Sequence, residues 1–169
     1  QATPETKDVL SEESAYVTLK LLEGVTEAGS GIRLRHVGAD KTNPIFRDIV
    51  TGYPYAFENP IAGKTGTTQN QSDGWFIGMV PNLATGVWVG GEDRATHFET
   101  ITYGQGATMA LPIWASYMKA CYADSTLTVS QEPFEAPAYV SIPLDCDSLS
   151  LARQQKSFFK DEDLSDLGF

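Results

Sequence analysis

Apolar residues recur at helical spacing near the start of the chain. The stripe consists of Ala15, Leu19, Leu22 and Val25. This spacing predicts a helix from Ser11 to about Val25, with Ser11 as its N-cap. The glycines of "EAGSG" predict the end of this helix. From 33 to 59 no period is clean, and we expect an irregular connection that ends at Pro60.

The pattern changes to short strand-like runs after that proline. Residues 61–68 are rich in threonine, 75–80 read "WFIGMV" and 87–91 read "VWVGG". We expect three strands in an antiparallel meander, linked by a turn at "QNQSDG" and a tight connection at "PNLATG". Aromatic and branched residues stand in consecutive positions, which predicts a sheet covered on both faces by helices.

A second helix is predicted over residues 104–122. Its stripe consists of Met109, Ile113, Tyr117 and Cys121. Pro112 requires that the helix begin near it or bend there. We therefore predict an α+β fold, with residues 1–123 as the main domain. Residues 124–169 form an extension with a short helix near 148–159 and an acidic tail.

Composition excludes several classes of function. The chain has 169 residues, 41% of them hydrophobic and 20% charged, which fits one globular domain. The net charge of −10 argues against nucleic-acid binding, which needs clustered Lys and Arg. No apolar run reaches the length of about 20 residues that a membrane span needs, and no basic-then-apolar leader opens the chain.

Cysteine and histidine spacing predicts no metal centre and no cofactor. Cys121 and Cys146 lie in no C-x-x-C motif, so a single disulfide and two free thiols both stay open. His36 and His97 are isolated, and we expect structural or surface roles for both.

Lys64 lies between Gly63 and Thr65, which permits a phosphate loop, one wall of a serine-acylation site, or a plain surface lysine. A phosphate loop needs a glycine five residues before Gly63, a position that Glu58 occupies. Pro60 falls inside the expected loop, and a strand follows where a helix is required. The phosphate interpretation is therefore rejected.

Under the acylation interpretation, each residue of the motif has a chemical role. Lys64 brings positive potential for a substrate carboxylate and influences the protonation of nearby hydroxyls. Gly66 allows a peptide to lie close to the strand. The N–H of Thr67 suits an oxyanion, and the hydroxyls of Thr65 and Thr67 suit a carboxylate. Alternation places Lys64 and Gly66 on one face of the strand, and Thr65 and Thr67 on the other.

Five ordered segments carry a resemblance to a known family. They read "SEESAYVTLKLLEGVTEAGSG", "AGKTGTT", "SDGWFIG", "GVWVGGED" and "GQGATMALPIW". Over roughly residues 9–122 the chain resembles the C-terminal part of the transpeptidase domain of class A, bifunctional penicillin-binding proteins. The resemblance implies a serine acyl-enzyme that cross-links peptidoglycan stem peptides ending in D-Ala-D-Ala and that reacts with β-lactams. It also implies a fused glycosyltransferase and an anchor on the periplasmic side of the inner membrane, both upstream.

By this resemblance Lys64 and Thr67 are catalytic, and Lys64, Thr65, Gly66 and Thr67 bind substrate. Trp75 and Trp88 are assigned to the sheet core rather than to the site.

The chain departs from the family at the nucleophile. Neither Ser-x-x-Lys nor Ser-x-Asn occurs upstream of Gly63, and the two Ser-x-x-Lys matches, at Ser116–Lys119 and Ser157–Lys160, lie downstream. We expect a fragment that is inactive alone and needs the upstream part of its own chain. We also expect an exposed sheet face or edge that favours self-association, although the oligomeric state stays open. The alternative is a non-catalytic, penicillin-recognising or cell-wall scaffold module.

Overall fold

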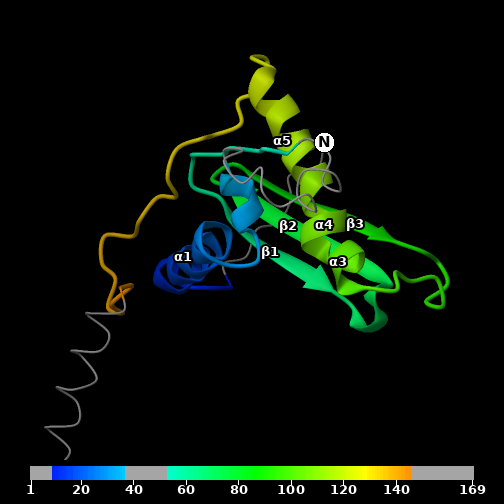
Figure 1. The fold of residues 1–169 in the computed structure, drawn as a ribbon. Helices are drawn as coiled ribbons and strands as arrows, with labels where there is room; N and C mark the ends of the chain where they lie inside the picture. Colours follow the sequence, from blue (N-terminus) through cyan, green and yellow to red (C-terminus); the bar gives the residue numbers. More distant parts are fainter. Residues whose placement is uncertain (1–8, 37–52, 146–169) are drawn as a thin grey trace, which may run out of the picture. The chain divides into compact units, whose positions relative to one another are not determined.

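A computed structural model describes residues 9–36 and 53–145 of the chain (Figure 1). The helical elements are α1 (Glu12–Glu27), η1 (Ile32–Arg35), η2 (Gln69–Gln71), α3 (Ile101–Gly104), α4 (Gly106–Met109) and α5 (Leu111–Ala123). The strands are β1 (Ala62–Thr67), β2 (Asp73–Val80) and β3 (Leu83–Gly90). Internal contacts divide the chain into two units, one of residues 19–135 and one of residues up to 18 with those from 136 onward. The α+β class is confirmed.

Helix α1 begins where the sequence predicts. The Oγ of Ser11 accepts a hydrogen bond from the N–H of Ser14 (3.2 Å), as an N-cap does. The predicted apolar stripe is only half-buried, and the buried positions are instead Glu23 and Thr26. The reason lies in the last turns of the helix, where the hydroxyl of Thr26 donates to the carbonyl of Ile61 (2.7 Å). Polar contacts thus hold α1 to the residue before β1.

Thr26→Val is expected to destabilise the fold by about 1–3 kcal/mol, because it leaves buried polar groups without a partner. The lost hydroxyl donates to Ile61 and accepts from Nη2 of Arg35 (3.0 Å). Urea unfolding measures the change. Thr18→Val on the same helix is the control, since Thr18 is exposed, and its effect should stay within about 0.5 kcal/mol. Equal losses in both variants would contradict this account.

The sheet is an antiparallel meander in the order β1-β2-β3, as predicted. Its links are shorter than expected. Val80 pairs with Leu83, so only Pro81 and Asn82 form the turn, and the expected connection "PNLATG" is mostly strand. Asp73 also belongs to β2 rather than to the preceding turn. A two-residue hairpin extends both strands, because pairing continues up to the turn.

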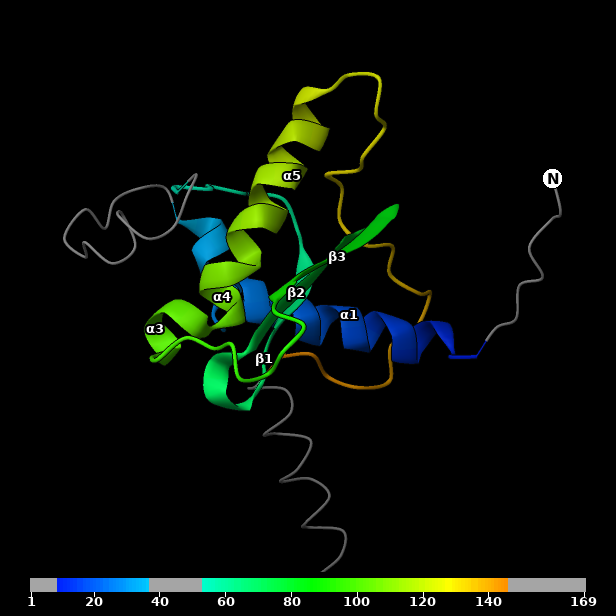
Figure 2. The ribbon, with the colours of Figure 1, turned by 90° about the vertical axis from the view of Figure 1, so that its right-hand side faces the viewer.

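The two faces of the sheet differ. Helices α4 and α5 lie against one face (Figure 2), and that face holds the core. The core cluster consists of Leu34, Tyr55, Phe57, Ile61, Phe76, Val80, Ala110, Leu111, Trp114, Ala115 and Met118. On the other face Trp75, Ile77 and Trp88 are 44%, 46% and 47% exposed. Within the described residues the prediction of two covered faces is therefore wrong, as is the core assignment of Trp75 and Trp88. The expected exposed face is confirmed.

The second predicted helix divides at Ala110. Helix α4 ends before this residue and α5 begins after it, with Pro112 in its first turn. The predicted stripe is wrong at Ile113 and Tyr117, which are 52% and 45% exposed, whereas Cys121 is buried as predicted. The buried residues of α5 are Leu111, Pro112, Trp114, Ala115, Met118 and Cys121. Trp114 selects this face, since its ring lies over Gly78 of β2.

Residues 124–145 contain no helix or strand. In the sheet unit, Asn82 donates to the carbonyl of Thr128 (2.5 Å) and accepts from the N–H of Ser130 (2.8 Å). In the other unit, the N–H and hydroxyl of Ser141 donate to Glu13, and these hydrogen bonds lower the pKa of that carboxyl. The predicted helix near 148–159 lies outside the described residues. Among the helices that are described, none is long and apolar enough to span a membrane.

Candidate functional site

The backbone N–H and C=O groups of β1 alternate between two directions, toward β2 and away from it. Thr68, just after β1, donates its N–H to the carbonyl of Asp73 (3.1 Å), so the ladder is hydrogen-bonded at this pair. Directions alternate along an antiparallel strand, so Gly66 also bonds to β2, whereas Thr65 and Thr67 direct their N–H and C=O away from β2. Since β1 is an edge strand of the described sheet, these groups point out of the sheet.

The outward groups of β1 and of the residue before it differ in their partners. The carbonyl of Ile61 accepts from Thr26, and the carbonyl of Thr65 accepts from Nζ of Lys64 (2.8 Å). The N–H and C=O of Thr67 have no partner among the residues that the structure describes. The edge therefore offers an ammonium group beside an unpaired N–H donor. An anion or an oxyanion that lies along this edge would meet both.

The side chains of the motif alternate across the strand as predicted. Lys64 pairs with Ile77 and Gly66 with Trp75, so both motif residues belong to the exposed face. Thr67 lies toward the helices, where its Oγ1 accepts from the N–H of Gly106 (3.0 Å).

Thr65 and Gly66 of the motif both lie close to neighbouring residues. The hydroxyl of Thr65 lies 2.6 Å from that of Ser30, in the turn after α1. A Cβ added at Gly66 would lie 3.1 Å from the Cβ of Trp75. Glycine at position 66 therefore suits the tight packing of β1 on β2, besides leaving room for a peptide.

Three residues of this region were not predicted from sequence. They are Ser30, Arg33 and Gly106. The segments "AGSG" and "GQG" carried the available signal, because closely spaced glycines permit close approach of two backbones. For Arg33 the sequence carried no signal, since its acceptors lie 74 and 75 residues away.

Comparisons with known proteins give the family, although no protein-family model matches the chain. Penicillin-binding protein 1A of Pseudomonas aeruginosa is 31% identical over 138 residues, or 81% of this chain and 14% of that protein. Penicillin-binding protein 1A of Aquifex aeolicus is 31% identical over 134 residues, or 79% and 15%. Penicillin-binding protein 1B of Buchnera aphidicola is 30% identical over 116 residues, or 69% and 13%. The chain belongs to the class A penicillin-binding proteins.

This finding confirms the resemblance inferred from the five ordered segments. The chain spans only 13% to 15% of the length of these penicillin-binding proteins, and so corresponds to a small part of such a protein.

The downstream Ser-x-x-Lys pair at Ser116 lies on α5. Ser116 is exposed there, and Nζ of Lys119 donates to the carbonyl of Pro54 (3.0 Å) rather than to the serine. The other pair, Ser157 and Lys160, lies outside the described residues. The structure therefore does not bring Ser116 and Lys119 together as a nucleophile and its base.

The other candidate residues lie apart from the motif. His97 is exposed with Nδ1 3.1 Å from the carbonyl of Phe98, and the ring of His36 lies 5.8 Å from that of Tyr53. Cys121 is a buried free thiol, and Cys146 lies outside the described residues. Within 9–36 and 53–145, no three His, Cys, Asp or Glu side chains form a group that could hold a metal ion.

A cavity of about 380 Å³ lies beside β3 and α4. It is lined by Ser72, Val89, Gly90, Gly91, Thr96, His97, Phe98 and Met109. None of the four motif residues lines it. In this penicillin-binding protein the candidate site is therefore the open edge of β1, not this cavity.

Proposed function

We propose that the protein is a serine-type D,D-transpeptidase, and that this chain supplies the Lys-Thr-Gly wall of its active site. One observation carries the proposal: the ammonium of Lys64 lies at the outer edge of β1, next to the unpaired N–H of Thr67. Such an edge binds an extended peptide by strand addition and presents a donor to an oxyanion. In the same proposal the protein carries a peptidoglycan glycosyltransferase, and acts on the periplasmic side of the inner membrane through an upstream anchor.

The proposed reaction uses this edge in both of its steps. A serine oxygen bonds to the carbonyl carbon of the penultimate D-alanine, and the oxyanion that forms accepts from the N–H of Thr67. The C–N bond then breaks, and the terminal D-alanine leaves with a proton on its amine. An amine of a second stem peptide next attacks the ester and releases the serine. A β-lactam opens its ring amide in the first step, but its leaving group stays attached.

The nucleophile of this reaction belongs to a part of the protein outside this chain. Ser116 is unsuited, because Lys119 binds the carbonyl of Pro54. An activated nucleophile with its base is indispensable to acyl transfer. We therefore infer that the chain alone forms no acyl-enzyme, and that the Ser-x-x-Lys and Ser-x-Asn motifs come from upstream residues.

Mass spectrometry with benzylpenicillin tests the proposal. The intact protein should gain the mass of one penicillin, on a peptide upstream of this chain, and the chain alone should gain none. Penicillin with its ring already hydrolysed is the control and should add no mass. Absence of an adduct on the intact protein would favour a non-catalytic binding module. An adduct on the isolated chain that is lost in Ser116→Ala or Ser157→Ala would overturn the assignment of the nucleophile.

A further inference from the structure

Thr67 is held from the helix side of the sheet by the first residue of α4. The N–H of Gly106 donates to Oγ1 of Thr67 over 3.0 Å. The first N–H groups of a helix have no acceptor within the helix, so the threonine hydroxyl supplies one across 39 residues of sequence. The residue whose own N–H points out from the edge is therefore restrained through its side chain.

Gly106 lies directly on the backbone of the sheet. A Cβ at this position would lie 2.3 Å from the carbonyl oxygen of Gly66 and 2.4 Å from that of Trp75. Only glycine fits between α4 and these two peptide groups, because the atoms in contact are backbone and cannot rotate away. The start of α4 is thus in contact with β1 and β2 at the residues next to Thr67.

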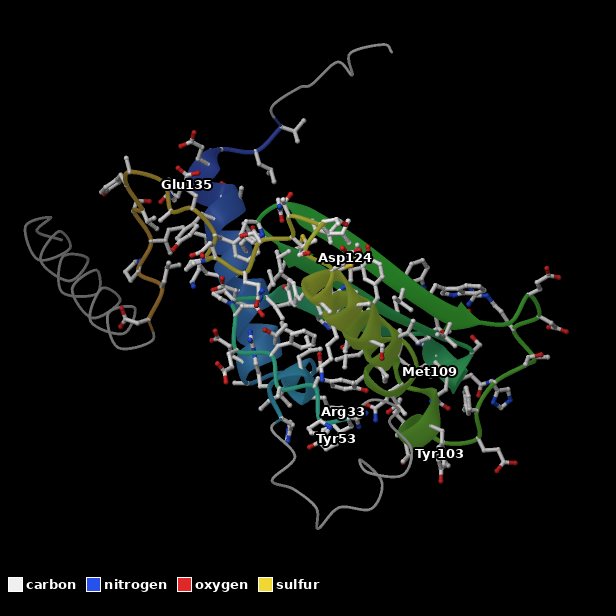
Figure 3. The ribbon with its side chains drawn as sticks, turned by 90° about the horizontal axis from the view of Figure 1, so that it is seen from above. Arg33, Tyr53, Tyr103, Met109, Asp124 and Glu135 are labelled. Atoms are coloured by element: carbon white, nitrogen blue, oxygen red, sulfur yellow. The ribbon has the colours of Figure 1, made fainter. Side chains whose placement is uncertain are left out.

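Arg33 holds α4 from η1. Its Nη1 donates to the carbonyl of Ala107 (3.0 Å) and to Oγ1 of Thr108 (2.8 Å), both in α4. The side chain is buried, and burial lowers the pKa of the guanidinium. Coulombic interactions with Tyr55 and, to a smaller extent, with Tyr53 oppose this shift, and Figure 3 shows Arg33 near Tyr53. A buried cation needs its hydrogen-bond acceptors in place, so these contacts couple the position of α4 to Arg33.

We propose that Arg33 is a positioning residue for the acylation step, and that it acts through α4 and Gly106 on the oxyanion donor of Thr67. This inference rests on the proposed transpeptidase function. A preorganised N–H is effective only when it points at the oxyanion, and removal of one such donor costs about 10²–10³ in rate. Misdirecting the donor without removing it should cost less, roughly tenfold.

The test compares two arginines of the same turn in the intact protein. Arg33→Lys loses the paired hydrogen bonds to α4. Arg35→Lys is the matched control, because Nη1 of Arg35 binds the carbonyls of Phe57 and Asn59 rather than α4. We expect the second-order rate of acylation by benzylpenicillin to fall roughly tenfold in Arg33→Lys and to stay within about twofold in Arg35→Lys. Equal rates in the wild type and Arg33→Lys would overturn the proposal.

A double-mutant cycle separates positioning from general loss of stability. Thr67→Val removes the acceptor for Gly106, so Arg33→Lys should cause little further loss of acylation in that background. The effects of Arg35→Lys and Thr67→Val should instead multiply. Multiplying effects for Arg33→Lys and Thr67→Val would contradict the proposed coupling.

Hydrogen exchange gives a readout that does not depend on acylation. Arg33→Lys should speed exchange of the Gly106 amide in the intact protein, while Arg35→Lys leaves it unchanged. If benzylpenicillin does not acylate the wild type, the proposed function fails. The exchange measurement still tests the contact in that case, because unchanged exchange of the Gly106 amide in Arg33→Lys would show that Arg33 does not hold α4. Should Arg33→Lys fail to fold, Thr108→Val removes one of its two acceptors and is expected to change both readouts in the same direction.

Discussion

Trp114→Ala is expected to remove about 3–5 kcal/mol from the free energy of unfolding, a large share of the roughly 5–15 kcal/mol that stabilises a domain. The side chain is fully buried, and its ring lies 5.2 Å from that of Phe76 and 6.2 Å from that of Phe57. Its Nε1 donates to Oγ1 of Thr85 (2.7 Å). Alanine would leave a cavity between α5 and the sheet and an unpaired hydroxyl, which urea unfolding would report.

Trp88→Ala is the matched control for this prediction. Trp88 lies on the other face of the same sheet and is nearly half exposed, so its removal should cost less than about 1 kcal/mol. A loss as large as that of Trp114→Ala would show that the face with Trp75 and Trp88 is covered in the protein whose unfolding is measured, and would contradict the assignment of a single core face.

Local patterns predicted the elements well because local chemistry decides them. Ser11 caps α1, and Pro112 lies in the first turn of α5, where its missing N–H costs nothing. The three strands follow β-branched and aromatic runs. Their ends were less predictable, since pairing of Leu83 with Val80 depends on the partner strand.

Burial was predicted poorly wherever a distant partner decides it. On α5 the apolar residues fit more than one stripe, and the glycine at position 78 selects Trp114 because a Cβ there would lie 2.3 Å from its ring. Thr26 and Arg33 are buried through acceptors 35 and 74 residues away, which no local pattern contains.

The candidate site also has one part that the sequence predicts and another that depends on distant partners. The motif from Lys64 to Thr67 was found from residue types and order alone. Its outward N–H follows from the phase of the β1–β2 ladder, which the hydrogen bond of Thr68 establishes. The contact of Thr67 with Gly106 joins residues 39 positions apart and required the structure.

Lys64→Gln is expected to lower the acylation rate of the intact protein by about 10²–10³, comparable to the loss of an oxyanion-hole donor. Nζ of Lys64 lies at the carbonyl of Thr65, on the edge where the substrate carboxylate would arrive. A charge-assisted hydrogen bond is lost together with the positive potential of the ammonium. Stability should change little, because the side chain is exposed. Benzylpenicillin acylation followed by mass spectrometry measures the rate.

Comparison of two substrates then shows what Lys64 does. If its ammonium binds the substrate carboxylate, Lys64→Gln should slow acylation by benzylpenicillin far more than acylation by the methyl ester, which lacks that charge. Equal losses with acid and ester would assign Lys64 to the protonation of the nucleophile instead. Lys119→Gln is the control, since this exposed lysine of α5 binds the carbonyl of Pro54 and should leave both rates unchanged. A wild-type rate in Lys64→Gln would refute a catalytic role for Lys64, whose ammonium lies at this edge of β1.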